Sequence, residues 1–268
     1  MWETLPLKIN PVLADFGWFS LRWYSLAYLL ALLTLFGLVN WRLNRQEIFF
    51  QKNPTEIKDR LWTIFLWSFL GMFLGAKLGF VIFYDWSNFL ADPWSTLSPF
   101  SQGRWIGFFG LSFHGGLLGV LSASFWAARK AKLDWLKISD LISPAFPLAY
   151  FWGRLGNFFN GELFGKTTDM PWGMYFSADP TTLRHPSQLY EALGEGILIF
   201  LILWPIRNQP AFRNQFLFFF LILYGLIRFT LEFFRQEPLF LFDLLTKGQV
   251  LCLIMVFVGL GEIGRAHV

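Results

Sequence analysis

Residues 61–84 read LWTIFLWSFLGMFLGAKLGFVIFY, and Lys77 is the one charged residue among them. A helix needs roughly 20 predominantly apolar residues to cross a bilayer, and this stretch is long enough. Its glycines Gly71, Gly75 and Gly79 recur at every fourth position, which is the spacing of a face along which two membrane helices pack closely. The stretch therefore predicts a membrane-spanning helix, and we favour packing over chemistry as the role of its glycines.

The rest of the chain has the same apolar character. Only 15% of the 268 residues are charged and 21% are aromatic, with a mean hydropathy of +0.46, whereas soluble domains average about 25% charged residues. The sequence predicts an all-α polytopic membrane protein with about seven transmembrane helices in a single domain over residues 1–262. The apolar runs fall near 17–40, 61–84, 105–128, 138–159, 189–206, 214–234 and 248–262.

The composition also excludes several classes of function. The net charge of +4 arises from basic residues beside apolar runs, where they set topology, so we expect no nucleic-acid partner. The chain has one cysteine, Cys252, and neither an HExxH nor a CxxC motif. A disulfide framework and a metal site are therefore not expected.

Lysine and arginine are distributed unevenly among the loops. The loops after the first, third and fifth runs carry eleven of them, and the opposite side carries six. Positively charged loops stay in the cytoplasm. This bias predicts an N-terminus outside the membrane and a C-terminus in the cytoplasm.

With that topology, unusual polar residues gather at the outer ends of five distant segments, and we expect nothing comparable on the inner side. Polar groups at membrane depth are costly and usually functional, so their convergence predicts an outward-facing site. Its members are Arg22, Tyr24, His114, Arg154, Asn157, Asn160, Glu162, His185, Gln188, Tyr190, Glu191, Tyr224, Arg228, Glu232 and Arg235.

The spacing of these residues favours an anion site. Arg228, Glu232 and Arg235 share one helical face, and Arg154 and Asn157 share another. Arginine binds phosphate through two parallel hydrogen bonds, which lysine does less well. We expect Arg154 and Arg228 to grip a phosphate.

Plainer interpretations of the same residues remain open. Arg228 and Glu232 fit an intramembrane ion pair, and Arg154 fits a side chain that reaches the headgroups. His114 fits a hydrogen-bonded loop histidine, and Tyr24 an interfacial aromatic anchor. Glu191 lies near the outer end of its run, but the deeper Glu195 has no role that spacing assigns.

Four motifs resemble one family. GRLGNFFNGELFG at 153–165 resembles the signature of prolipoprotein diacylglyceryl transferases, which are bacterial membrane enzymes. SFHGGLLG, RHPSQLYEAL and EFFRQ are similar to that family's other marked segments, in the same order. One departure is Lys77, which stands where the family pattern has arginine, so a headgroup role there is in question.

The resemblance implies a reaction and its partners. The diacylglyceryl group of phosphatidylglycerol moves onto the thiol of a lipobox cysteine in a prolipoprotein signal peptide, and glycerol phosphate is released. No cofactor is expected, because the lipid carries its own leaving group. The expected location is the bacterial cytoplasmic (inner) membrane, with several spans in the bilayer and the active site facing outward.

The resemblance also implies roles for individual residues. We expect His114 to take the thiol proton and Arg154 and Arg228 to stabilise the leaving phosphate; these are the candidate catalytic residues. The candidate substrate-binding residues are Tyr24, Asn157, Asn160, Glu162, Gly165, His185, Tyr224, Glu232 and Arg235.

Two other classes of function were weighed. A transporter or flippase for an anionic lipid needs polar groups near the midplane, often in paired broken helices, and no inverted repeat is evident in the sequence. A non-catalytic scaffold gives no reason to gather arginines, asparagines and a histidine at one depth. The transferase is therefore the favoured interpretation.

The last residues, IGRAHV at 263–268, differ from the rest of the chain. A widely used sequencing-adapter oligonucleotide encodes the same residues in one reading frame. We therefore expect residues 263–268 to be a non-native tail, with an ordinary short cytoplasmic tail as the alternative.

Overall fold

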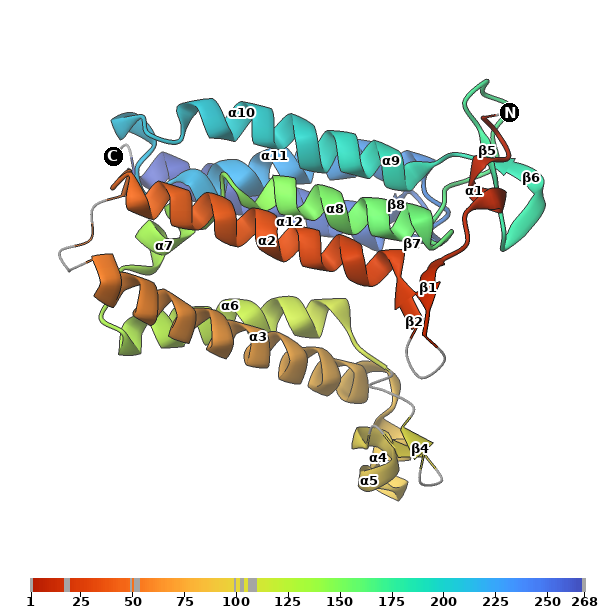
Figure 1. Cartoon of the computed structure of the whole chain (residues 1–268), viewed down its shortest axis with the longest axis horizontal. Helices are drawn as coiled ribbons and strands as arrows, with labels where there is room; N and C mark the ends of the chain where they lie inside the picture. The colour runs from red at the N-terminus through yellow and green to blue at the C-terminus, as the bar shows by residue number, and fades with distance from the viewer. Residues whose placement is uncertain are drawn as a thin grey trace. The chain divides into compact units, whose positions relative to one another are not determined.

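The computed structural model describes residues 2–16, 20–48, 50, 54–98, 100–101, 104–105 and 110–266. The chain is mostly helical and divides into two compact units, described separately below (Figure 1). The first unit comprises Met1–Ile48 and Ser139–Val268, and the second comprises Phe49–Ile138.

The second unit is built on two long helices, α3 (Pro54–Tyr84) and α6 (Phe113–Lys130). They pack through the predicted glycine face, because a Cβ added at Gly79 would lie 2.8 Å from the Cα atom of Gly115. A Cβ added at Gly75 would lie equally close, 2.8 Å, to the Cα atom of Gly119. The predicted packing role of the α3 glycines is thus confirmed.

The remaining elements of the second unit are short. Asp92 caps α5 by accepting hydrogen bonds of 3.1 Å from the backbone N–H groups of Trp94 and Ser95. These elements are α4 (Trp86–Ala91), α5 (Pro93–Leu97), and the paired strands β3 (Phe100–Ser101) and β4 (Arg104–Trp105).

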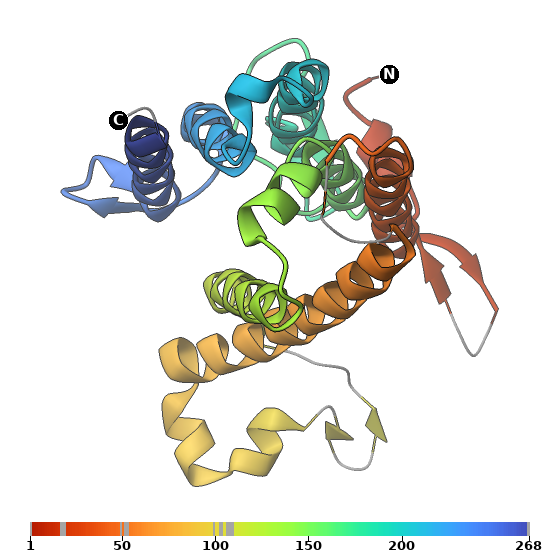
Figure 2. The same cartoon turned by 90° about the vertical axis from the view of Figure 1, so that its left-hand side faces the viewer.

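In the first unit, long helices lie side by side (Figures 1 and 2). Helix α7 (Trp135–Ile142) leads into it from the second unit. The helical elements of the first unit are α1 (Leu5–Lys8), α2 (Trp23–Asn44), α8 (Phe146–Phe159), α9 (Ser187–Glu191), η1 (Ala192–Leu198), α10 (Ile199–Ile206), η2 (Pro210–Phe212), α11 (Phe216–Leu231), η3 (Glu232–Phe234) and α12 (Lys247–Ala266).

Small antiparallel hairpins connect these helices, so the expectation of an all-α chain holds only for the main architecture. Each hairpin is a two-stranded sheet. They pair β1 (Val12–Asp15) with β2 (Ser20–Arg22), β5 (Met174–Phe176) with β6 (Asp179–Arg184), and β7 (Leu239–Leu241) with β8 (Leu245–Thr246).

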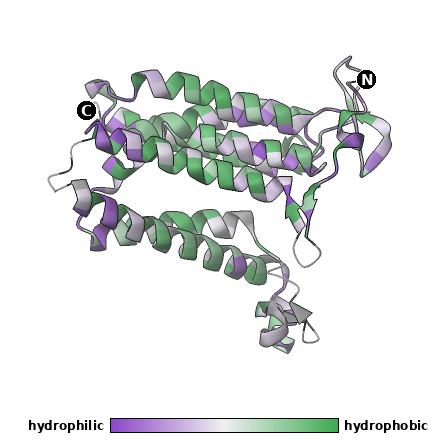
Figure 3. Cartoon of the chain, viewed as in Figure 1, coloured by the Kyte–Doolittle hydropathy of each residue, from purple (hydrophilic) through white to green (hydrophobic). Residues whose placement is uncertain are grey.

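Five helical segments of the described chain are long and apolar enough to cross a membrane. Figure 3 shows the helices mostly green, with purple gathered towards their ends. The five segments are Trp23–Asn44, Thr55–Ile82, Ser187–Ile206, Phe216–Phe234 and Lys247–Arg265. The mostly helical membrane architecture is therefore confirmed, while the count of seven and the orientation remain predictions.

One expected span differs in the structure. The apolar run at 138–159 is not one continuous helix, because α7 ends at Ile142 and α8 begins at Phe146. Pro144 and Pro147 explain the break, since proline removes a backbone donor and restricts the residue before it. At the far end of the chain, α12 continues through Ala266 into the expected tail, whose origin stays a prediction.

Candidate active site

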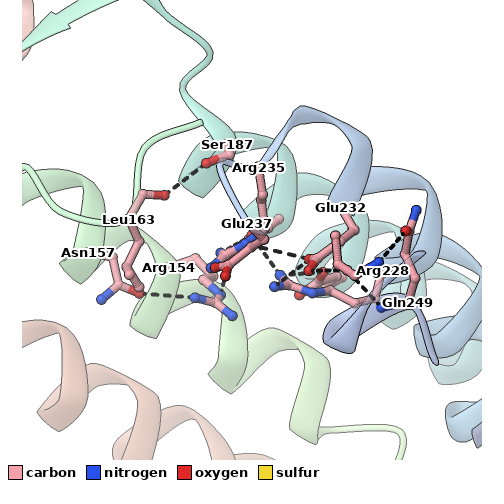
Figure 4. Close-up of polar contacts among 12 residues, drawn as sticks. Arg154, Asn157, Leu163, Ser187, Arg228, Glu232, Arg235, Glu237 and Gln249 are labelled. Atoms are coloured by element: carbon pink, nitrogen blue, oxygen red, sulfur yellow. Dashed lines mark hydrogen bonds and ion pairs between the residues drawn. The ribbon is translucent and has the colours of Figure 1, made fainter. Parts of the chain in front are cut away.

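Arg154, near the C-terminal end of α8, is held by side chains from two helices (Figure 4). Its Nε lies 2.9 Å from Oε2 of Glu191 and 2.6 Å from the hydroxyl of Tyr150. Its Nη1 donates to Oδ1 of Asn157 at 3.4 Å. Arg154 is thus fixed inside the bundle and not extended freely towards headgroups.

Glu191 is the common partner of three arginines. Its side chain is 0% exposed, and its carboxylate also lies 2.6 Å from Nη1 of Arg228 and 2.7 Å from Nη1 of Arg235. A buried carboxylate is tolerated when cations pair with it. Segments that are distant in the sequence therefore meet at one carboxylate.

Glu232 makes the contact expected from its spacing. Its Oε2 lies 3.1 Å from Nη2 of Arg228, one helical turn away. Its Oε1 accepts a hydrogen bond of 2.9 Å from the hydroxyl of Thr246. Glu232 therefore pairs with Arg228 and is itself held by Thr246 of β8, which in turn bonds to Gln249 in the first turn of α12.

Asn157 connects Arg154 to the loop that follows α8. Its Nδ2 donates to Oε1 of Glu162 at 2.8 Å. Asn160 is the C-cap residue of α8, and its backbone N–H bonds to the carbonyl of Gly156 at 3.0 Å. Asn157 thus links Glu162 to Arg154.

Gly165 lies where two chain segments approach closely. Its N–H donates to the carbonyl of His185 at 2.8 Å, and it forms an isolated bridge with Arg235. A Cβ at this position would lie 2.9 Å from the Cβ of His185. The glycine therefore allows the loop to reach the segment that carries Arg235.

His185 faces aromatic rings and not the arginines. Its Nδ1 lies 3.1 Å from the hydroxyl of Tyr190, and its ring lies 5.1 Å from that of Phe234. Partial burial lowers the pKa of His185, which favours its neutral form.

Two predicted tyrosines lie beside the cluster. Tyr24 lies in the first turn of α2, its hydroxyl lies 3.0 Å from that of Tyr28, and a Cβ added at Gly156 of α8 would lie 3.3 Å from its ring. The ring of Tyr224 packs edge-on against that of Tyr150, with centroids 6.0 Å apart. Both predicted residues therefore belong to the same end of the first unit.

His114 differs from the other predicted residues. It lies in the first turn of α6, in the second unit, and its side chain is outside the described residues. The assignment of His114 as the base is therefore a prediction from the sequence alone.

The sequence pattern missed two members of the cluster. The hydroxyl of Tyr150 donates to Oε2 of Glu195, and Oε1 of Glu195 lies 3.3 Å from Nη1 of Arg228. Tyr150 lies one helical turn before Arg154, and that spacing is the signal that would have identified it.

A second polar cluster lies at the end of the first unit that the charge bias predicts to be inner, so the expectation that nothing comparable collects there is wrong. Arg42 is 0% exposed, and its Nε lies 2.9 Å from Oε2 of Glu47. The second carboxylate oxygen of Glu47 lies 3.1 Å from Nη2 of Arg207. Arg42 and Arg207 were counted as loop charges, yet both are paired inside the unit, because the charge count records position and not partners.

The fold and the cluster define a helical membrane protein with an arginine-rich site suited to an anion. The chain belongs to the prolipoprotein diacylglyceryl transferase family, whose model matches residues 11–263.

Several bacterial relatives are similar over almost their whole length. A phosphatidylglycerol–prolipoprotein diacylglyceryl transferase of Chlorobaculum tepidum is 42% identical over 97% of this chain and 91% of its own. Proteins with the same name from Pseudoalteromonas atlantica and Pseudomonas fluorescens are 40% and 38% identical. These matches cover 96% and 97% of this chain, and 89% and 94% of the relatives.

Proposed function

We propose that this protein transfers the diacylglyceryl group of phosphatidylglycerol to a prolipoprotein. The observation that carries the proposal is the family match over residues 11–263, joined by relatives of that name at 36–42% identity. The acceptor within the prolipoprotein is the thiol of its lipobox cysteine.

The reaction is a displacement at a glycerol carbon of the lipid. The sulfur–carbon bond of a thioether forms while the carbon–oxygen bond to phosphate breaks, and the electron pair leaves on the phosphate oxygen. The products are the lipidated prolipoprotein and glycerol phosphate. His114 takes the proton of the thiol, whose ordinary pKa is about 8.5, because the thiolate is the nucleophile.

The arginine cluster supplies the electrostatic part of catalysis. The phosphodiester begins with one negative charge and becomes a phosphomonoester as the bond breaks. Donors that bind this charge more strongly in the transition state lower the barrier. Arg154 and Arg228 fit this role because both are already oriented by the carboxylate of Glu191.

The protein acts within the bacterial cytoplasmic membrane, and its site faces outward. Support comes from the five apolar helical segments and from the bias of basic residues, eleven against six, among the loops. The lipid then enters sideways from the outer leaflet.

The proposed reaction is tested by incubating the purified protein with phosphatidylglycerol and a lipobox peptide. The expected result is a mass gain of one diacylglyceryl unit on the cysteine. A peptide in which serine replaces that cysteine is the matched control. Movement of phosphatidylglycerol across vesicle membranes without any mass gain would instead support a flippase.

The orientation is tested with single cysteine reporters in a Cys252→Ser background. A reporter at Thr168 is expected to react with an impermeant reagent added outside intact cells, and one at Lys132 to be protected. The opposite labelling would overturn both the topology and the outward-facing site.

A further inference from the structure

Tyr150 and Glu195 complete a closed ring of polar contacts around the two candidate catalytic arginines. Arg154 contacts Glu191, and Glu191 contacts Arg228, at 2.9 and 2.6 Å. Arg228 contacts Glu195 at 3.3 Å, Glu195 accepts from Tyr150, and the Tyr150 hydroxyl accepts from Arg154 at 2.6 Å. Each of the five members thus touches two others.

The backbone around Glu195 is shaped so that the ring can close. Glu195 lies in η1, a π-helical segment, and such segments are often found at functional sites. A Cβ added at Gly196 would lie 2.7 Å from the Cβ of Phe151, the residue after Tyr150. A Cβ added at Gly194 would lie 3.0 Å from Ile227, the residue before Arg228. The two glycines therefore bring η1 close to α8 and α11 beside the ring.

The ring satisfies the arginines without saturating them. Its two guanidinium groups are balanced by two carboxylates that are each 0% exposed. Within the part of the chain that the structure describes, Nη2 of Arg154 makes no hydrogen bond, and the side chain is 15% exposed. A donor is thus held ready for an external anion.

We infer that Tyr150 and Glu195 are positioning residues for diacylglyceryl transfer, acting through Arg154 and Arg228; this inference rests on the proposed function. Tyr150 fixes the rotation of the Arg154 guanidinium, because its hydroxyl accepts the Nε–H hydrogen bond at 2.6 Å while the Glu191 carboxylate lies 2.9 Å from the same nitrogen as its ion-pair partner. Glu195 fixes the Tyr150 hydroxyl and shares Nη1 of Arg228 with Glu191. The ring thereby directs the remaining N–H donors of the two arginines to the phosphate as the negative charge of the phosphate grows.

The test compares Tyr150→Phe in two backgrounds. In the wild-type background it is expected to lower kcat by about tenfold, since a hydrogen bond to a charged group is lost, with little change in KM for phosphatidylglycerol. In the Arg154→Lys background the same change is expected to lower kcat by less than about twofold, because the group through which Tyr150 acts is already altered.

The matched control is Thr34→Val. It removes the acceptor of a 3.0 Å hydrogen bond from Trp152, which lies on the same helix as Tyr150 but outside the ring. It is expected to shift the thermal midpoint as much as Tyr150→Phe does, with kcat unchanged. Glu195→Gln with and without Arg228→Lys provides a second, independent pair if Tyr150→Phe does not fold.

Each outcome is decisive. Equal losses of kcat in both backgrounds, or a fall in the thermal midpoint with wild-type kcat, would overturn the positioning role and leave the proposed function intact. If the wild-type protein adds no diacylglyceryl unit to the peptide, the proposed function fails, irrespective of the variants.

Discussion

The first unit contains two arginine–carboxylate clusters, and they differ in what surrounds the arginine. Arg42 is 0% exposed, and its Nη1 donates to the backbone carbonyls of Asp140 and Leu141, each at 2.7 Å. Arg154 and Arg228 are 15% and 13% exposed and are held mainly by side chains. The Arg42 cluster joins main-chain segments, whereas the Glu191 cluster orients guanidinium groups.

The comparison separates structural arginines from candidate binding arginines. A guanidinium has five donors in a fixed fork. When backbone carbonyls occupy them, as at Arg42, the residue acts as a cross-link between segments. At Arg154, side-chain oxygens contact Nε and Nη1 and leave Nη2 available, so the guanidinium can bind an anion.

The largest expected effect is on stability at the Arg42 cluster. Arg42→Ala should lower the free energy of unfolding by about 3–5 kcal/mol, because it removes a fully buried cation that pairs with Glu47 and leaves two backbone carbonyls without their donor. The measurement is the thermal midpoint in detergent. Arg45→Ala is the control, since Arg45 is exposed and stacks on Trp41 at 4.5 Å, and it should cost less than about 1 kcal/mol. Equal effects would refute the structural role of Arg42.

The next largest effect is on activity at the Glu191 cluster. Arg154→Lys should lower turnover on the lipobox peptide by about 100-fold, since lysine lacks the second parallel donor to the phosphate. The thermal midpoint of the variant should stay near that of the wild type, because lysine keeps the positive charge and the aliphatic stem of the side chain. Arg60→Lys, at a pair with Glu56 in the second unit, is the control and should be silent. Wild-type turnover of Arg154→Lys would remove Arg154 from the site.

Acid should weaken the Arg42 cluster through Glu47. Burial alone would raise the pKa of Glu47, but hydrogen bonds from Arg207, Asn208 and Arg42 outweigh it and lower that pKa below its ordinary value. The pKa of Glu47 is therefore lower in the folded protein than in the unfolded chain, where it is about 4.3, so ionised Glu47 stabilises the folded state above pH of about 4.3. This stabilisation is lost as the pH falls through the folded-state pKa. The difference in thermal midpoint between wild type and Glu47→Gln should therefore shrink below pH of about 4. A constant difference down to pH of about 3 would contradict this account.

The smallest effect is expected at Lys77. Its Nζ lies 5.7 Å from the centre of the Phe80 ring on α3. Lys77→Arg should be neutral or mildly activating, since it restores a planar fork. Turnover on the lipobox peptide measures this, and a loss above about tenfold, roughly 1.4 kcal/mol, would indicate that the ammonium group has its own role.

Much of the fold could be predicted because its signals are local. The apolar runs predicted helices, and the four-residue spacing of Gly71, Gly75 and Gly79 predicted the packing face that α3 presents to α6. The break at 143–145 was missed because the prolines lie in a run whose hydropathy alone suggested one helix. The short hairpins were missed because two or three paired residues leave almost no pattern.

The candidate site could be predicted as a set of residues but not as a set of contacts. The helical spacing that grouped Arg228 with Glu232 corresponds to a contact in the structure, with Nη2 of Arg228 3.1 Å from Oε2 of Glu232. The same reasoning left Glu195 without a role, because its partners Tyr150 and Arg228 lie 45 and 33 residues away. It also treated Arg42 and Arg207 as loop charges, although both bind Glu47.

By itself, the sequence determined the membrane class, the helical runs, the family motifs and which polar residues are unusual. These follow from composition and from spacings within one helix, where geometry is known in advance. Only the tertiary structure decided that Glu191 binds three arginines and that Arg42 donates to the backbone carbonyls of Asp140 and Leu141. The reason is physical: a buried charge takes its partner from whichever segment packs beside it, and that choice is made by the packing of helices far apart in the chain.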